Sequence, residues 1–278
     1  MSYRSNSLGF KRPTGWSSPP SVKHLASLPH RIFTFASMSP ADPLPILYED
    51  DHFIAINKPQ GMLVHRSRMS EDTVFVLQTL RDQVGAPIFT IHRLDRATSG
   101  VLVYAKSAES AELLAAHFRE KTIEKKYLLI ARGWTDDQGV IDYAVRDQDK
   151  PDAEFLDAIT RYRTLGRSEV PHAIGNRHPT ARFSLVEAEP ETGRRHQIRK
   201  HFAHILHPVI GDKRHGDNKH NAYFWNVLEL PRMFLHAHRL QFDHPATGQA
   251  VSITAPIDDL FGRALLMLGL ENFMPVNA

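Results

Sequence analysis

Segments with the apolar pattern of strands and segments with the pattern of helices follow one another without a strict strand–helix–strand order. The strand patterns lie at 46–59, a hairpin with a polar turn at 49–51, at 101–105, 125–134 and 182–190, and at 233–256, a hairpin that turns at Pro245 and Gly248. The helix patterns lie at 73–85, 107–121, 194–206 and 257–270. Because a regular parallel sheet would need a helical crossover after each strand, this order favours an α+β fold around a mixed, mostly antiparallel sheet.

Side-chain spacing and capping residues define the helices at 73–85 and 107–121. In the first, the apolar residues at helical spacing are Val74, Leu77, Leu80 and Val84. Gly85 is the expected end of that helix. Ser107 has the residue type of an N-cap for the second.

The helix predicted at 194–206 combines an apolar stripe with cations. Ile198, Phe202 and Ile205 are expected to form its buried face. Arg195 and Arg199 are four residues apart, so on a helix they would share one flank of that face.

The composition, with 42% hydrophobic and 23% charged residues, is typical of an ordinary globular protein. The 278 residues suffice for a sizeable core. No apolar run approaches the roughly 18 residues that a membrane-spanning helix requires. The absence of cysteine excludes disulfides, thiolate zinc sites and a cysteine nucleophile, and it is consistent with a reducing compartment.

Residues 1–44 differ from the rest because they are rich in Ser and Pro and contain no acidic residue before Asp42. They show no sustained helical or strand period, so we expect a disordered segment or an over-long gene model that starts before Met38. An organelle transit peptide within residues 1–37 is the less favoured alternative. The folded domain is expected to span 45–278.

The formal net charge is only +3, but the cations are concentrated. Between Thr192 and Gly211 there is no acidic residue. The basic residues of this stretch are Arg194, Arg195, Arg199 and Lys200, with four histidines among them. Such a segment fits a polyanion such as a nucleic-acid backbone, and a solvated helix face explains it equally well at this point.

Several common catalytic and metal-binding patterns are absent. The chain has no nucleophile elbow, no phosphate-binding P-loop and no dinucleotide fingerprint. His201, His204 and His207 are spaced by three residues, which does not bring all three to one point on a helix. We therefore expect no metal site.

The segment HRLDRATSG, residues 92–100, places Asp95 between two arginines, just before the apolar strand VLVYA. The small residues Thr98 to Gly100 could present the carboxylate at a strand edge. A turn-capping aspartate is the simpler interpretation of this residue alone. A nearby cation such as Arg199 would instead favour an ionised, reactive carboxylate.

Five segments together resemble the RluA-type pseudouridine synthases. They are NKPQGMLVH, HRLDRATSGVLVYAKS, KKYLLIARG, ETGRRHQIRKHFAHILHPVIGD and FLHAHRLQFDHP, and they occur in that family's order over most of residues 46–256. The resemblance implies one catalytic domain on a mixed, mostly antiparallel sheet flanked by helices and loops. It also implies conversion of uridine to pseudouridine in RNA without cofactor or metal.

The resemblance also implies roles for particular residues. Asp95 would act as the catalytic carboxylate, Arg199 would pair with it, and Tyr127 would stack on the uracil. A uridine inside a stem must be flipped out, and Arg93 is the candidate to fill the space that it leaves. The expected RNA contacts are Arg93, Arg96, Arg194, Arg195 and Lys200. His92, His196, His236 and Lys58 also lie in the matching segments, where structural roles are the commoner case.

Two classes of function remain open at this point, an RNA-modifying isomerase and an RNA-binding or RNA-folding protein on the same scaffold. The set of Asp95, Tyr127 and Arg199 favours the isomerase, because a binder needs no carboxylate at a phosphate-binding surface. Among substrates tRNA is favoured over rRNA, since residues 1–44 are too short for an S4 domain. A cytoplasmic monomer with no obligate protein partner and no membrane association is expected.

Overall fold

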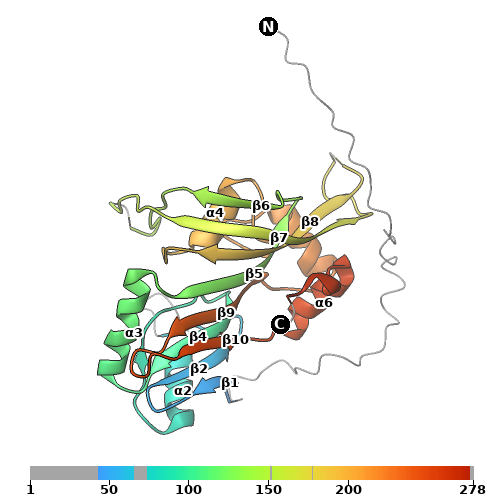
Figure 1. Cartoon of the computed structure of the whole chain (residues 1–278). Helices are drawn as coiled ribbons and strands as arrows, with labels where there is room; N and C mark the ends of the chain where they lie inside the picture. The colour runs from blue at the N-terminus through green and yellow to red at the C-terminus, as the bar shows by residue number, and fades with distance from the viewer. Residues whose placement is uncertain (1–42, 66–73, 151, 177, 276–278) are drawn as a thin grey trace.

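The computed structural model describes residues 43–65, 74–150, 152–176 and 178–275 (Figure 1). Of the predicted N-terminal extension, 1–44, only the last two residues lie within these ranges. The predicted start at Met38 and the alternative of a transit peptide within residues 1–37 lie outside the described residues. The packed chain includes Leu44, which is buried and exchanges two hydrogen bonds with the side chain of Gln83, of 2.8 and 3.1 Å.

The described strands form one ten-stranded sheet with the path β1-β2-β4-β9-β5-β8-β7-β6, to which β3 adds beside β4 and β10 beside β9 (Figure 1). The strands are β1 (Ile46–Glu49), β2 (Phe53–Lys58), β3 (Phe89–Thr90), β4 (Ser99–Ala105), β5 (Glu124–Arg132), β6 (Gln138–Asp142), β7 (Ile159–Val170), β8 (Ala181–Pro190), β9 (Leu235–Asp243) and β10 (Ala250–Thr254). All pairings are antiparallel except β4 with β9. The predicted mixed, mostly antiparallel sheet is confirmed.

Helices cover both faces of this sheet. They are α2 (Val76–Val84), α3 (Ala108–Glu120), α4 (Gln197–His204), the short α5 (Asn218–Ala222) and α6 (Asp259–Leu268), with a π-helical turn at Tyr223–Val227 and a 3-10 turn at Glu271–Phe273. Alternate residues of β5 point to opposite faces. Leu128 packs in the core that contains α6, whereas Leu129 packs in the core that contains α4. In the same way α2 and α3 lie on opposite faces of β2 and β4.

The predicted elements are present, with two corrections at helix starts. Val74 lies before α2 and is 37% exposed, because the helix begins at Val76. Arg195 lies before α4, whose first residue is Gln197, so Arg195 and Arg199 do not share a helix flank as predicted. Ser107 caps α3 by accepting a hydrogen bond from the backbone of Ser110, as expected.

Three strands of the sheet were not predicted, the two-residue β3 and the neighbouring strands β6 and β7. Strand β7 reads ITRYRTLGRSEV, in which arginines interrupt the apolar pattern. Several of these arginines pair with acidic residues of neighbouring segments, for example Arg163 with Glu187 at 3.0 Å. Packing between strands rather than apolar alternation therefore determines this part of the sheet.

Strand β9 lies between β4, which follows the loop that carries Asp95, and β5, which carries Tyr127. Gly100 of β4 and Tyr127 of β5 are both register partners of Ala237 in β9. Gly100 has φ +111°, and a Cβ atom there would lie 2.2 Å from the carbonyl oxygen of Ala237. Glycine is thus required for the close approach of β4 to β9.

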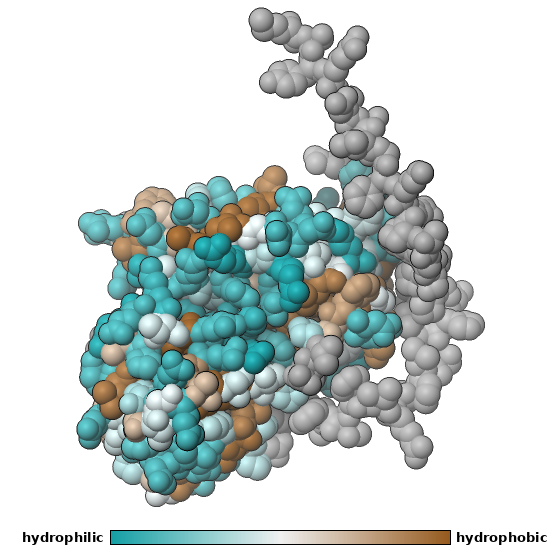
Figure 2. All heavy atoms as spheres, viewed as in Figure 1, coloured by the Kyte–Doolittle hydropathy of each residue, from teal (hydrophilic) through white to brown (hydrophobic). Residues whose placement is uncertain are grey.

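None of the helices among the described residues is long and apolar enough to cross a membrane. The face shown in Figure 2 is mostly hydrophilic, with scattered hydrophobic patches.

Candidate active site

Lys58, the last residue of β2, contacts the loop that carries Asp95 and is fully buried. Its ammonium group donates hydrogen bonds to three backbone carbonyls, those of Thr98 at 2.8 Å, Pro59 at 2.9 Å and Arg96 at 3.2 Å. Burial lowers the pKa of Lys58 to about 7, although the charge of Asp95 acts in the opposite direction. Lys58 therefore fixes the backbone that follows Asp95.

A second contact fixes the same loop from the turn after β2. The backbone N–H of Gly61 donates to the carbonyl of Arg96 at 2.8 Å, and Nε of Arg96 donates to the carbonyl of Gly61 at 2.9 Å. Within the loop, the N–H of Thr98 donates to the carbonyl of Asp95 at 3.1 Å. Arg96, predicted as an RNA contact, thus holds the loop in place, while much of its side chain is exposed.

Arg199, in the first turns of α4, joins two carboxylates. Its Nη1 donates to Oδ2 of Asp95 at 2.9 Å. Its Nε and Nη2 donate to the two carboxylate oxygens of Asp212 at 2.7 and 2.8 Å. The Asp95 side chain is 20% exposed, whereas that of Asp212 is completely buried. The predicted pairing of Arg199 with Asp95 is present, and one edge of the Asp95 carboxylate remains accessible.

Asp212 and Arg199 stabilise each other's charged forms. Burial alone would lower the pKa of Arg199, but the hydrogen bonds and charge of Asp212, and then Asp95, raise it. Burial alone would raise the pKa of Asp212, but the hydrogen bonds and charge of Arg199 lower it. The backbone N–H groups of Arg214 and His215 also donate to Asp212. The two hydrogen bonds between Arg199 and Asp212 hold the guanidinium of this buried ion pair in one orientation.

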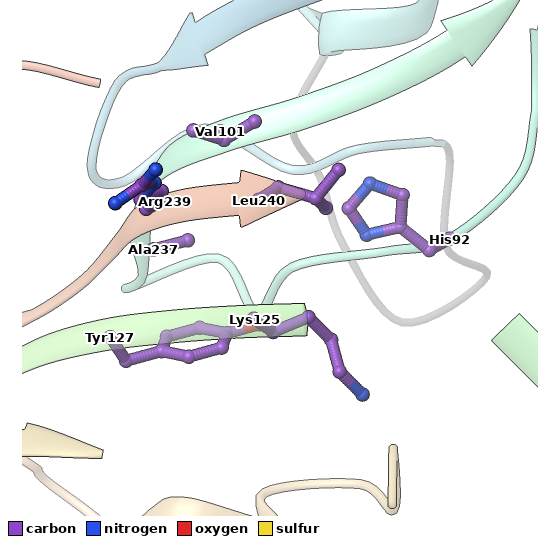
Figure 3. Close-up of a pocket in the computed structure, with 7 residues that line it drawn as sticks. All are labelled: His92, Val101, Lys125, Tyr127, Ala237, Arg239 and Leu240. Atoms are coloured by element: carbon purple, nitrogen blue, oxygen red, sulfur yellow. The ribbon is translucent and has the colours of Figure 1, made fainter. Parts of the chain in front are cut away.

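Tyr127 lies in β5 next to a small pocket (Figure 3). The pocket is lined by His92, Val101, Lys125, Tyr127, Ala237, Arg239 and Leu240. Burial, and to a smaller extent the negative charge of Asp95, raise the pKa of the Tyr127 phenol. The phenol is thus protonated at neutral pH, in the same electrostatic environment as Asp95.

Behind Asp95, a polar network fixes the start of β4. The hydroxyl of Ser99 lies 2.8 Å from Nδ1 of His236, whose Nε2 lies 3.0 Å from the carbonyl of Ala255. Buried Arg232 donates to Ser99 at 3.0 Å and pairs with Asp258, the N-cap of α6. Burial lowers the pKa of His236 to about 3. The imidazole is therefore neutral and has a structural role.

His196 is the other side chain that approaches Asp95. Its Nε2 lies 3.7 Å from Oδ2 of Asp95, and its Nδ1 lies 3.0 Å from Nε2 of His215. Burial lowers the pKa of His196 to about 4, despite the opposing charge of Asp95. His196 is thus a neutral neighbour of the carboxylate.

His92 is structural, since its Nε2 accepts a hydrogen bond from the backbone of Val103 at 3.0 Å.

The remaining predicted RNA contacts fall into two groups. Arg93 is exposed and forms no hydrogen bond or ion pair with the described residues. Arg194 and Lys200 donate to backbone carbonyls, and Arg195 pairs with two carboxylates, all in the segment between β6 and β7. These three cations are therefore already engaged within the protein.

The three spaced histidines have separate partners. Nε2 of His201 lies 2.9 Å from the carbonyl of Tyr143, and the ring of His204 stacks on Tyr143 at 3.6 Å. Nδ1 of His207 lies 2.8 Å from the carbonyl of Arg132. Within the ranges that the structure describes, no group of three or more histidine or carboxylate side chains is placed to hold a metal ion.

Sequence reasoning missed Asp212, Gln197 and Arg232. Asp212, in the segment HPVIGD, is the first acidic residue after the acid-free stretch. This position could have indicated it as a partner for one of the cations of that stretch. The Gln197 amide accepts hydrogen bonds from Thr192 and from the backbone of Arg194, which fixes the turn before α4. Arg232 gave no signal, because nothing in its local sequence indicates a buried cation.

Comparison with known proteins shows close relatives. Residues 52–204 match the RNA pseudouridylate synthase family. The tRNA pseudouridine synthase C of Vibrio parahaemolyticus is 47% identical over 231 residues, which cover 80% of this chain and 93% of that protein. The tRNA pseudouridine synthase C of Salmonella typhimurium is 45% identical over 243 residues, 84% of this chain and 93% of that protein.

A solved structure shares the fold. Human RNA Pseudouridylate Synthase Domain Containing 4 superposes with a TM-score of 0.64 at 24% identity, over 81% of this chain and 93% of that one.

Proposed function

The chain belongs to the RNA pseudouridylate synthase family, and we propose that its substrate is a uridine in tRNA. Family membership confirms the predicted enzyme class, an isomerase that converts uridine to pseudouridine in RNA. The names of the relatives that are 43–47% identical over most of the chain support tRNA rather than rRNA. We further propose that the protein acts as a monomer in the cytoplasm.

The ion pair between Asp95 and Arg199, at 2.9 Å, is the observation that supports the catalytic assignment. The reaction breaks the N1–C1′ bond, turns the uracil and forms the C5–C1′ bond; C5 loses a proton to solvent and N1 gains one from solvent. The Asp95 carboxylate is the group that acts on the nucleoside, by attack at C1′ or C6 or by assisting a glycal intermediate. Arg199 orients it through the hydrogen bond from its Nη1 to Oδ2 of Asp95.

Tyr127 and Arg93 have complementary roles in this proposal. The Tyr127 ring stacks on the flipped uracil beside Asp95 and takes part in proton transfer at C5. Arg93 projects from the same loop as Asp95 and is unengaged among the described residues. It fills the space that the uridine leaves in a stem.

The substitution Asp95→Asn tests the catalytic assignment. The amide keeps the shape of the side chain but is not a nucleophilic anion, so pseudouridine formation should be lost while tRNA affinity changes little. Release of tritium from tRNA labelled at uridine C5 measures turnover. Appreciable turnover by this variant contradicts the mechanism.

The substrate requires a separate experiment. Carbodiimide primer extension on total RNA, from cells with and without the gene, maps each pseudouridine that depends on it. A site in tRNA is expected. Loss of an rRNA site alone would replace tRNA by rRNA as the substrate.

A further inference from the structure

The connection between β6 and β7, of which the structure describes residues 143–150 and 152–158, is here called the arm (Figure 1). Val145 and Leu156 exchange two backbone hydrogen bonds of 2.9 Å, and Val145 is buried. Beyond this pair the side chains of the arm are less packed, with Phe155 61% exposed. Polar contacts rather than core packing therefore hold the tip of the arm.

The arm is acidic and lies against the basic stretch around α4. It contains five acidic residues and two basic ones. Nη1 of Arg195 pairs with Asp147 at 2.7 Å, and its Nη2 pairs with Asp149. Arg214 forms two hydrogen bonds to the same Asp149 carboxylate, of 3.1 and 2.5 Å. One carboxylate thus lies between two guanidinium groups.

Backbone carbonyls of the arm engage the other cations. Nζ of Lys200 donates to the carbonyl of Arg146 at 2.6 Å, and Nε of Arg194 donates to the carbonyl of Asp157 at 3.2 Å. The three cations of the basic stretch that were expected to contact phosphates, Arg194, Arg195 and Lys200, all have their partners in the arm.

The position of Asp149 has the chemistry of a phosphate site. A phosphodiester also carries a negative charge on two oxygens, and arginines bind it with the same geometry. Hydrogen bonds from Arg214, and then Arg195, hold the pKa of Asp149 well below its ordinary value, so it remains an anion. The paired side chains are 26–38% exposed, so solvent and a phosphate can reach the ion pairs and salt screens them.

We propose that Arg195 and Arg214 form a binding surface for backbone phosphates of the RNA substrate, and that Asp147 and Asp149 occupy this surface until RNA displaces them. The surface borders the catalytic group, because Arg195 directly precedes His196, which lies 3.7 Å from Asp95. The inference rests on the proposed function, in that the ligand is the RNA on which Asp95 acts.

Displacement of the arm has a measurable consequence in the dependence of binding on salt. Cations that bind phosphate normally release condensed counterions, which gives affinity its steep salt dependence. Here each phosphate replaces a carboxylate of the protein, and that carboxylate attracts cations again once it is free. Arg195 and Arg214 therefore contribute less to the salt slope than free arginines would.

The test is the double substitution Asp147→Asn/Asp149→Asn, which removes both charges and keeps the shape of the side chains. The matched control is Asp152→Asn/Glu154→Gln, which removes two charges from the same arm at exposed residues that do not contact these arginines. Binding of a fluorescent tRNA transcript is measured by anisotropy over a range of salt concentrations, with thermal melting to verify folding.

The Asp147/Asp149 variant should bind about three- to tenfold more tightly at low salt. Its plot of log affinity against log salt should also be steeper by up to about two units. The Asp152/Glu154 control should change affinity less than about twofold, because distant exposed charges are screened. In an Arg195→Gln/Arg214→Gln background, Asp147→Asn/Asp149→Asn should have no effect.

Equal gains in the two acidic variants would reduce the effect to net charge and overturn the proposal. Unchanged or weaker binding by the Asp147/Asp149 variant, or a gain that persists without the two arginines, would overturn it as well. Turnover of tRNA by the wild type is measured in parallel by tritium release. Absence of turnover would reject the proposed tRNA substrate, whereas the binding comparison decides the role of the arm.

Discussion

Asp212 holds Arg199 by two hydrogen bonds, of 2.7 and 2.8 Å, and leaves Nη1 of the guanidinium for Asp95. The buried carboxylate has no access to solvent, so its contribution to the reaction is made through Arg199. Asp212 is in this sense a positioning residue, and the orientation of Asp95, the proposed catalytic carboxylate, depends on it.

Asp212→Asn should therefore lower both activity and stability. It leaves Arg199 with one charged partner instead of two, and breaking a buried pair costs about 3–5 kcal/mol in the free energy of unfolding. Denaturant unfolding and tritium release measure the two effects. The exposed pair of Arg81 with Asp82 provides the control, since Asp82→Asn should change stability by less than about 0.5 kcal/mol. Equal effects of the two substitutions would show that Asp212 has no special role.

Tyr127→Phe separates stacking from proton transfer. The ring remains, so tRNA affinity should be close to that of the wild type, while turnover should fall because the phenol is absent. Tyr127→Leu should weaken binding of the flipped nucleotide too, by about 1–3 kcal/mol, the usual contribution of an aromatic ring stacked on a base. Full turnover by the phenylalanine variant would leave the hydroxyl without a function.

Arg93→Ala should affect structured RNA selectively. If Arg93 fills the gap left by the flipped uridine, turnover of a stem should fall while turnover of a short single strand remains. The ratio of the two rates at fixed salt is the measurement. Arg119 of α3, 61% exposed, serves as a control for loss of one surface cation. An equal loss on both substrates would make Arg93 a phosphate contact.

Lys58 predicts a dependence of stability on pH. Its pKa is about 7 in the folded protein against 10.5 in the unfolded chain. Between these values the unfolded chain binds the proton that the folded protein lacks, so the free energy of unfolding rises with pH, by at most about 1.4 kcal/mol per pH unit. Below about pH 7 Lys58 is protonated in both the folded protein and the unfolded chain, so there it adds no pH dependence to the free energy of unfolding.

Comparison of the wild type with Lys58→Met isolates this effect. Lys125, whose pKa burial lowers to about 8, contributes equally to both proteins. Denaturant unfolding at several pH values between about 7 and 9.5 should show a rise in the wild type that is smaller in the variant. Parallel curves would mean that Lys58 keeps its proton throughout.

Gly100→Ala should be far more damaging than Gly248→Ala. Both glycines have positive φ, +111° and +69°, so both substitutions strain the backbone. At Gly248 nothing lies within 4 Å of the added methyl group, whereas at Gly100 it would lie 2.2 Å from the Ala237 oxygen. Gly248→Ala should cost about 1–2 kcal/mol, and Gly100→Ala should disrupt the contact between β4 and β9. Similar melting temperatures for the two variants would refute the steric argument.

The local sequence predicted the hairpins and four helices, because apolar period and capping residues carry that information. The pairing of Asp95 with Arg199 was implied by the family resemblance, through the order of the matching segments. The local sequence did not predict β7, whose arginines pair with acidic residues of other segments, or the start of α4 after Arg195. Asp212 and Arg232 act through contacts with residues far away in the chain. Such contacts depend on the register of the sheet, which no single segment specifies.

Strand β9 gives the site a definite order of assembly. Asp95, Tyr127 and Arg199 all precede residue 204, yet the strand that separates β4 from β5 spans Leu235–Asp243. A chain emerging from the ribosome therefore contains its reactive groups before it contains the backbone that places Gly100 and Tyr127 on either side of Ala237. We therefore expect a chain that ends before β9 to lack activity, because the strand that joins the two halves of the proposed site is missing from it.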